Sequence, residues 1–172
     1  MKSGAGGFTI IEAIITIAVL GILTAVAAPS MTALLAGNRL SSVSNETLGA
    51  MMLARSEALR TGRQVVVCKS TDSSSCSTSA SWADGWIVFV DEDASGARNG
   101  TESVLRSGGL AKGVSGAGES GVEDKVMYSA RGSLTIAGGT PKIVFGISGQ
   151  KQRELQFTPT GRVSVVVGGT SP

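Results

Sequence analysis

Apolar and polar residues divide the chain into three stretches. Residues 8–28, FTIIEAIITIAVLGILTAVAA, are apolar throughout and carry one charge. After Pro29 the apolar residues recur every three or four positions, which is the period of a helix packed on one face. Beyond Gly62 they come in short runs between turn residues, as in strands. We therefore expect one helix over 8–61, about 80 Å long at 1.5 Å per residue, and a β-rich head over 62–172.

The second part of this helix, residues 29–61, is predicted to be amphipathic and to pack on the head. Leu40, Val43 and Met51 belong to its apolar stripe, and Gly62 is a plausible end. Proline removes a helical hydrogen bond, so a bend is expected near Pro29.

The head is predicted to contain short strands, and its aromatic residues are expected in the core. The expected strands cover 64–68, 85–91, 103–108, 125–130, 133–137, 142–147, 154–158 and 162–167. The aromatic residues are Trp82, Trp86, Phe89 and Phe145. Residues 108–124, rich in Gly, Ser and Ala, are expected to form a long mobile loop. The fold class is α+β, with a long N-terminal α-helix packed on a small antiparallel β-sheet head.

The composition argues against an enzyme. There is no histidine, so the commonest general base and the commonest zinc ligand are missing. Lys69 and Ser70 are the nearest approach to a Ser–Lys pair, and they match no helical SxxK motif. We expect no catalytic residue, no metal and no cofactor. The net charge of +2 does not by itself indicate a nucleic-acid partner.

The two cysteines lie close together in CKSTDSSSC. A disulfide between Cys68 and Cys76 would close a short loop and place the head in an oxidising compartment. The alternative is a pair of free surface thiols.

The apolar N-terminal run has two unusual features. It is long enough to span a bilayer as a helix, yet the small pair Gly6–Gly7 precedes it, so that cleavage there would keep it in the mature chain. It also contains Glu12, and a carboxylate at membrane depth is costly and usually functional. Cleavage after Gly7 would give Phe8 a new α-amine, and we expect Glu12 to pair with this amine on a neighbouring subunit.

These residues resemble a known family. GFTIIE, at positions 7–12, is similar to the class III signal of type IV prepilins and type II secretion pseudopilins. The resemblance implies that a prepilin peptidase removes residues 1–7 and methylates Phe8, and that Glu12 serves subunit pairing. Pro29 lies where helices of this family commonly kink.

The head carries a second resemblance. LARSEALRTGRQVVVCKS, followed by WADGWIVFVDED and later ELQFTPTGRVSV, is similar to the minor-pilin group known as GspH/FimT. This implies a type IV pilin fold, often with two small sheets, and a low-abundance subunit that primes or caps a fibre. Its partners would be other major and minor pilins. Such a protein starts in the bacterial inner membrane with its head in the periplasm and ends in a pilus, or in the pseudopilus of type II secretion.

The segment from Asp91 to Glu102 permits two interpretations. Asp91, Asp93, Ser95, Gly96 and Glu102 fit the spacing of a calcium loop. Against calcium, a positive charge enters the loop at position 98, and the flanks are predicted to be strands. A solvated hairpin explains the same residues by their turn chemistry.

DNA binding is an alternative function. Some FimT-like pilins bind DNA through a C-terminal Gly-Arg-x-Arg turn, which Arg162 matches here, although Ser164 replaces the second arginine. Lys142, Lys151 and Arg153 lie nearby in sequence and could complete a basic patch. Otherwise Arg162 is a strand-turn residue on a solvated face.

Overall fold

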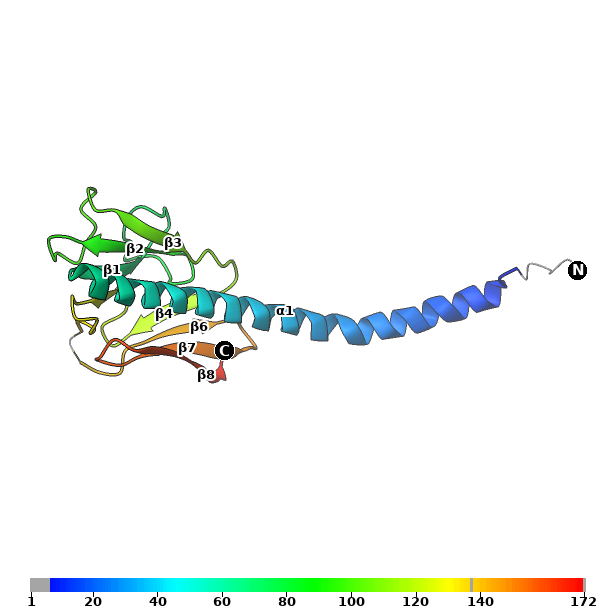
Figure 1. Cartoon of the computed structure of the whole chain (residues 1–172). Coiled ribbons are helices and arrows are strands. Elements are labelled where there is room, and N and C mark those ends of the chain that lie inside the picture. Colours follow the sequence, from blue (N-terminus) through cyan, green and yellow to red (C-terminus); the bar gives the residue numbers. More distant parts are fainter. Residues whose placement is uncertain (1–6, 137, 172) are drawn as a thin grey trace, which may run out of the picture. The chain divides into compact units, whose positions relative to one another are not determined.

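The computed structural model describes residues 7–136 and 138–171, with all their side chains except those of residues 26–30. It forms two compact units, residues 1–36 and 37–172. Helix α1 (Ile10–Thr61) runs through both and is followed by the strands of the head (Figure 1). The strands are β1 (Gln64–Lys69), β2 (Trp86–Asp91), β3 (Val104–Gly108), β4 (Ser115–Glu119), β5 (Lys125–Tyr128), β6 (Lys142–Gly146), β7 (Lys151–Phe157) and β8 (Val163–Thr170).

Both ends of α1 have local causes. At its start Thr9 is the N-cap, since its hydroxyl oxygen accepts a hydrogen bond from the Glu12 N–H at 3.3 Å. At its end Gly62 has a φ of 64°, a left-handed conformation that glycine adopts without strain, and its N–H donates to the Ala58 carbonyl at 3.0 Å. The predicted helix end at Gly62 is confirmed.

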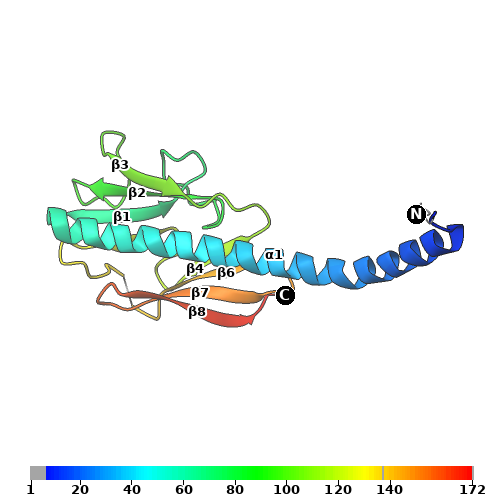
Figure 2. The same ribbon diagram turned by 45° about the vertical axis from the view of Figure 1, so that its right-hand side comes forward.

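The strands form two antiparallel sheets of four. The first has the order β3-β2-β1-β5 and the second β4-β6-β7-β8. In the views of Figures 1 and 2 the part of α1 that belongs to the head runs along both sheets. The fold class is therefore α+β, as the sequence predicts.

One apolar core joins the helix to the two sheets. It contains Leu40 and Met51 from α1, Val67 from β1 and Phe145 from β6, all at most 1% exposed. Trp82, Trp86, Phe89 and Phe145 are all buried, as predicted. A smaller cluster lies on the opposite face of the first sheet and contains Val66, Cys68, Ile87 and Phe89.

Two predictions about the head are wrong. The expected loop 108–124 contains β4, whose sequence SGAGE has weak strand propensity. Its glycines permit a close approach, because a Cβ on Gly116 would lie 2.7 Å from the Ala83 nitrogen. Conversely, the strand expected over 133–137 is only an isolated bridge between Leu134 and Tyr128, since its backbone bonds go to different partners. Residue 137 lies outside the described residues.

The predicted membrane span and the predicted kink of the N-terminal helix are not confirmed by the structure. Over the residues that the structure describes, no helix combines the length and the apolarity that crossing a membrane requires. The predicted span over 8–28 is therefore not confirmed. It overlaps residues 26–30, whose side chains lie outside the described residues. The expected kink at Pro29 falls in the same stretch and stays a prediction.

Candidate functional site

The proposed processing site lies just ahead of α1. Gly7 and Phe8 precede the helix, and the Phe8 side chain is 75% exposed. A Cβ on Gly7 would meet no atom within 4 Å, so the site is open on this side. Glu12 is exposed and lies in the first turn of α1. Its carboxylate is therefore available to a group from outside the chain.

Thr9 is a local feature that the sequence analysis missed. Thr9 and Glu12 are spaced as in a capping box, in which a hydroxyl residue at the N-cap is followed three positions later by glutamate. The Thr9 hydroxyl takes up one of the free N–H groups at the helix start. The signal was present in the letters T-x-x-E. The cap places the first helical turn, and with it Glu12, next to Phe8.

Large apolar side chains of the first unit are exposed around the whole helix. Ile10 is 82% exposed, Ile17 70% and Leu23 62%. The other large apolar side chains of this unit that are at least half exposed are Phe8, Ile11, Ile14, Ile15, Val19, Leu20, Ile22, Met31, Leu34 and Leu35. A helix that is apolar on all sides is normally covered by other protein or by lipid.

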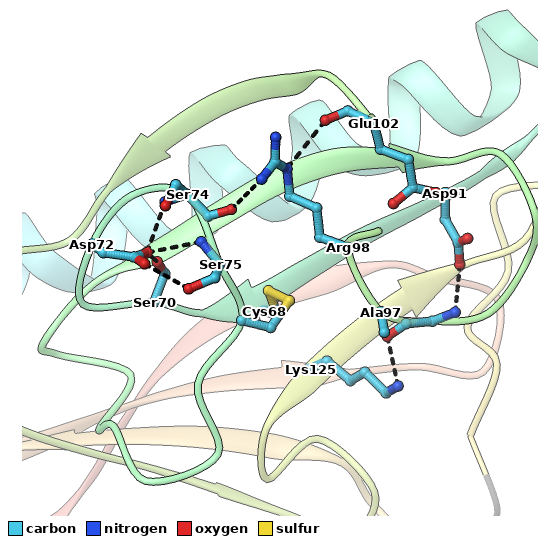
Figure 3. Close-up of a disulfide and its surroundings, with 12 residues drawn as sticks. Cys68, Ser70, Asp72, Ser74, Ser75, Asp91, Ala97, Arg98, Glu102 and Lys125 are labelled. Carbon is cyan, nitrogen blue, oxygen red and sulfur yellow. Dashed lines mark hydrogen bonds between the residues drawn. A yellow bond between two sulfur atoms is a disulfide. The ribbon is translucent and has the colours of Figure 1, made fainter. Parts of the chain in front are cut away.

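The disulfide loop of the head contains a carboxylate, that of Asp72, which accepts several hydrogen bonds from within the loop. Cys68 and Cys76 form the predicted disulfide (Figure 3). Inside the loop, Asp72 accepts hydrogen bonds from the Ser75 hydroxyl at 2.6 Å and from the Ser74 and Ser75 N–H groups at 2.8 Å each. These bonds, first among them that of the Ser75 hydroxyl, hold the pKa of Asp72 far below its usual value.

The residues of the weak Ser–Lys candidate have other roles. The Lys69 ammonium is buried and lies 2.6 Å from the Asp124 carboxylate, and it also donates to the Thr78 carbonyl. The Ser70 hydroxyl donates to Asp72 at 3.0 Å. The nearest approach to a Ser–Lys pair is therefore engaged in structural contacts, Lys69 with Asp124 and Thr78, and Ser70 with Asp72.

The loop from Asp91 to Glu102 is held by its own acidic residues. Asp91 is 2% exposed and accepts from the N–H groups of Ser95 at 3.1 Å and Gly96 at 2.7 Å. Glu102 is 4% exposed and accepts from two further backbone N–H groups of the loop, those of Glu92 and Asn99. The hairpin interpretation thus needs a correction, because two of the acids are buried and not solvated.

This geometry bears on the calcium alternative. Carboxylate oxygens of Asp91, Asp93 and Glu102 lie within 4.8 Å of one another. Asp91 and Glu102 already accept backbone hydrogen bonds, and Asp93 accepts from Ser95 and from the Asn99 side chain. The carboxylates of this loop therefore already accept hydrogen bonds from the loop itself. Calcium binding stays an untested alternative to the predicted absence of a metal.

Arg98 joins the two loops. Its guanidinium donates to the Ser74 carbonyl of the disulfide loop at 2.5 Å and to the Glu102 carbonyl at 3.1 Å (Figure 3). Lys125 of β5 donates to the Gly96 carbonyl at 2.6 Å and ties the acidic loop to the first sheet. Arg98, whose positive charge argues against calcium binding in this loop, therefore serves to bond the two loops through their backbone carbonyls.

The four basic residues considered for DNA binding do not form one patch. Lys142 pairs with Glu119 at 3.4 Å and Glu154 at 3.9 Å. Arg153 points its guanidinium to the Ser41 hydroxyl at 3.4 Å. Lys151 pairs in register with Thr170 and so lies at the opposite end of the β7–β8 hairpin from exposed Arg162.

Arg162 instead has a basic neighbour that the sequence analysis missed. Arg55 of α1 donates to the carbonyls of Gly132 at 3.1 Å and Thr160 at 3.0 Å. Arg55 and Arg162 line the same hollow, of about 230 Å³. No local pattern signals this neighbour, since the contact joins residues far apart in the chain.

Comparison with known families identifies both parts of the chain. The model of the family described as Type II transport protein GspH matches residues 43–170. The prokaryotic N-terminal methylation motif matches residues 2–28. No protein in a search of curated sequences matches the chain significantly.

Solved structures show the same fold. The type IV minor pilin FimU of Pseudomonas aeruginosa is 22% identical, with a TM-score of 0.58 over 75% of this chain and 89% of FimU. The minor pseudopilin EpsH of the Vibrio cholerae type 2 secretion system is 13% identical, with a TM-score of 0.51 over 75% of this chain and 97% of EpsH. The chain therefore belongs to the GspH family and is, by family and fold, a minor pilin or pseudopilin.

Proposed function

We propose that this protein is a non-enzymatic subunit that primes or caps a type IV pilus or a type II secretion pseudopilus. A prepilin peptidase would cleave it between Gly7 and Phe8 and methylate Phe8. The apolar helix would rest in the inner membrane, with the head in the periplasm, until it enters the fibre. Glu12 would then pair with the N-terminal amine of a neighbouring pilin.

One observation carries this proposal. The large apolar side chains of the first unit from Phe8 to Leu35 that are at least half exposed lie on every side of the helix. Apolar surface of this extent is stable only when it is removed from water, at about 25 cal/mol per Å². The methylation motif, which matches residues 2–28 and so includes most of these side chains, supports other pilins as the cover.

The test is incorporation into fibres. The full-length chain is co-expressed with a prepilin peptidase and the pilins of its own genome, and sheared fibres are analysed by mass spectrometry. We expect a mature chain that begins at a methylated Phe8. We expect Glu12→Ala to be processed alike and to be lost from the fibres. Unprocessed chain, or a fibre content of Glu12→Ala equal to the parent, would contradict the proposal.

We do not propose DNA uptake as a second function, because the structure does not gather Lys142, Lys151, Arg153 and Arg162 into one patch. The gene neighbourhood separates the two fibre types. Minor pilin genes indicate a type IV pilus, and secretion-pathway genes indicate a pseudopilus.

A further inference from the structure

Strand β8 differs from the other edge strands of the head. β3, β4 and β5 are four or five residues long, and each carries one charged residue, namely Arg106, Glu119 or Lys125. β8 is eight residues long, VSVVVGGT, and carries none. Natural proteins protect sheet edges with charges and short strands, and a long uncharged edge is a template for an added strand. β8 is therefore the edge with the least protection against pairing.

Hydrogen-bond alternation shows which backbone groups of β8 face outward. The turn before β8 is closed by the Thr158 N–H, which donates to the Arg162 carbonyl at 2.9 Å. Residues that bond the partner strand recur every second position in an antiparallel ladder. Ser164 and Val166 therefore face β7, as their register with Gln156 and Glu154 allows.

The other valines of this part of β8 form a row of backbone groups on its outer edge, which we call the outward row. The N–H and C=O groups of Val163, Val165 and Val167 face away from β7. Among residues 7–136 and 138–171, no backbone hydrogen bond from another segment reaches this row. The register with β7 is regular from Val163 to Val167, so the row is straight enough to pair with another strand.

Two hollows lie where β8 meets α1. The first, of about 210 Å³, is lined by Ser41 and Asn45 of α1, Arg153 of β7 and Val165 of β8. The second, of about 230 Å³, is lined by Met52 and Arg55 of α1 and by residues 161–163. Met52 is 60% exposed although it lies on a helix that packs on the head. We use the name β8 seam for the outward row together with these two hollows.

The charge of the β8 seam has one sign. Its charged lining residues are Arg55, Arg153 and Arg162. None of them forms an ion pair with a carboxylate among the described residues; Arg55 and Arg153 bond only carbonyl or hydroxyl oxygens. A partner that carries carboxylates could form ion pairs with the guanidinium groups of these arginines.

We propose that the β8 seam binds an extended segment of another protein subunit, which adds to the second sheet as a further strand. The segment is rich in β-branched residues at its centre and carries carboxylates at its flanks. The proposal rests on the proposed function only in taking the partner to be another fibre subunit. Pairing of β8 with β8 of a second copy fits less well, because that strand is uncharged and follows Arg162. DNA would use the arginines but not the outward row.

The first experiment separates strand addition from other binding. The probe is a fluorescent synthetic peptide of alternating valine and threonine with a glutamate at each end, and its anisotropy is measured with the full chain in detergent. Two N-methylated peptides accompany it, each methylated on alternate amides. We expect one of them to lose at least about tenfold in affinity, as for the loss of one or two hydrogen bonds, and the other to bind like the parent peptide.

The second experiment changes the protein. Val167→Pro removes an outward N–H and leaves the bonds to β7, and proline is tolerated at such edge positions. Val167 is 51% exposed, so little packing is lost. We expect about a tenfold loss of peptide affinity with a parent-like melting temperature, and no loss for the matched variant Val167→Thr. If Val167→Pro does not fold, Arg162→Gln serves instead. It should weaken the glutamate peptide and leave a glutamine-ended version unchanged.

Several results would overturn the proposal. The first is equal affinity of the two N-methylated peptides for the parent protein. The second is parent-like affinity of folded Val167→Pro for the unmethylated peptide. The third is parent-like affinity of Arg162→Gln for the glutamate-ended peptide. Tighter binding of a duplex oligonucleotide that displaces the peptide would make the β8 seam a phosphate-binding surface. Self-association of the parent that Val167→Pro abolishes would identify a second copy as the occupant. None of these results depends on incorporation into fibres, so the failure of this proposal and of the proposed function can be told apart.

Discussion

The two parts of α1 carry similar apolar side chains in opposite surroundings. In the first unit Ile10 is 82% exposed and Ile17 70%, whereas in the head Leu40 is 1% and Met51 0% exposed. The head contributes two sheets that cover its part of the helix. In the described part of the first unit, nothing from the chain covers the apolar side chains. The head therefore has its own core, and the N-terminal part of the helix needs surroundings that other molecules supply.

The sharpest way to break this comparison is to make the same Ile→Ala substitution in the first unit of α1 and in the core of the head that covers the rest of α1. Ile143 of β6 is fully buried in the core that α1 shares with the two sheets, and Ile17 of α1 is 70% exposed. We expect Ile143→Ala to lower the free energy of unfolding of the head by about 2–5 kcal/mol, because it removes buried methylenes and leaves a cavity. Ile17→Ala should change it by less than about 0.5 kcal/mol. Denaturant unfolding of the full chain in detergent, followed by tryptophan fluorescence, measures both.

The disulfide should matter next most. It closes a loop with a sequence separation of 8 residues, so its removal by Cys68→Ala with Cys76→Ala should cost about 2–3 kcal/mol by loop-closure entropy. The same unfolding curves show this cost. The first unit contains no cysteine, so reducing agent should leave its fibre contacts unchanged. Parent-like stability of the double variant would show that the loop is held by its hydrogen bonds alone.

A smaller effect is expected from Asp72. Hydrogen bonds from Ser75 and Ser74 favour its ionised form in the folded head and lower its pKa. A group with a lowered folded pKa stabilises the protein above its unfolded pKa, near 4, and loses that contribution as the pH falls further. Asp72→Asn cannot titrate, so its stability should fall less than that of the parent between about pH 6 and pH 3. Ser75→Ala should give an intermediate profile, and identical profiles for parent and Asp72→Asn would exclude this role.

Much of the fold could be predicted, because its signals are local. The long helix follows from unbroken apolar periodicity, and its end follows from Gly62. The strands with valine, isoleucine and aromatic residues were found within a few residues of their observed bounds. Strand β4 was missed because SGAGE pairs through its close approach to Ala83 and not through strand propensity.

The candidate site was predicted less completely. Gly7, Phe8 and Glu12 stand in one short motif, so their predicted roles in processing and subunit pairing follow from the sequence alone and stay predictions. The burial of Asp91 and Glu102 was missed because turn residues look alike whether a loop is solvated or closed on its own carboxylates. The contact of Arg55 with the Gly132 and Thr160 carbonyls joins segments far apart in the chain, and no local pattern reveals it.

The most direct test of the central claim is a photo-crosslinker at position 17, in place of Ile17, in cells that express the chain with the pilins of its own genome. The account predicts crosslinks to other pilin-type subunits, and their marked reduction when Glu12→Ala is added. The same crosslinker in place of buried Ile87 should give none between chains. Absence of crosslinks to pilin subunits at position 17, or crosslinks that Glu12→Ala leaves unchanged, would contradict the claim that other pilins cover this helix through Glu12.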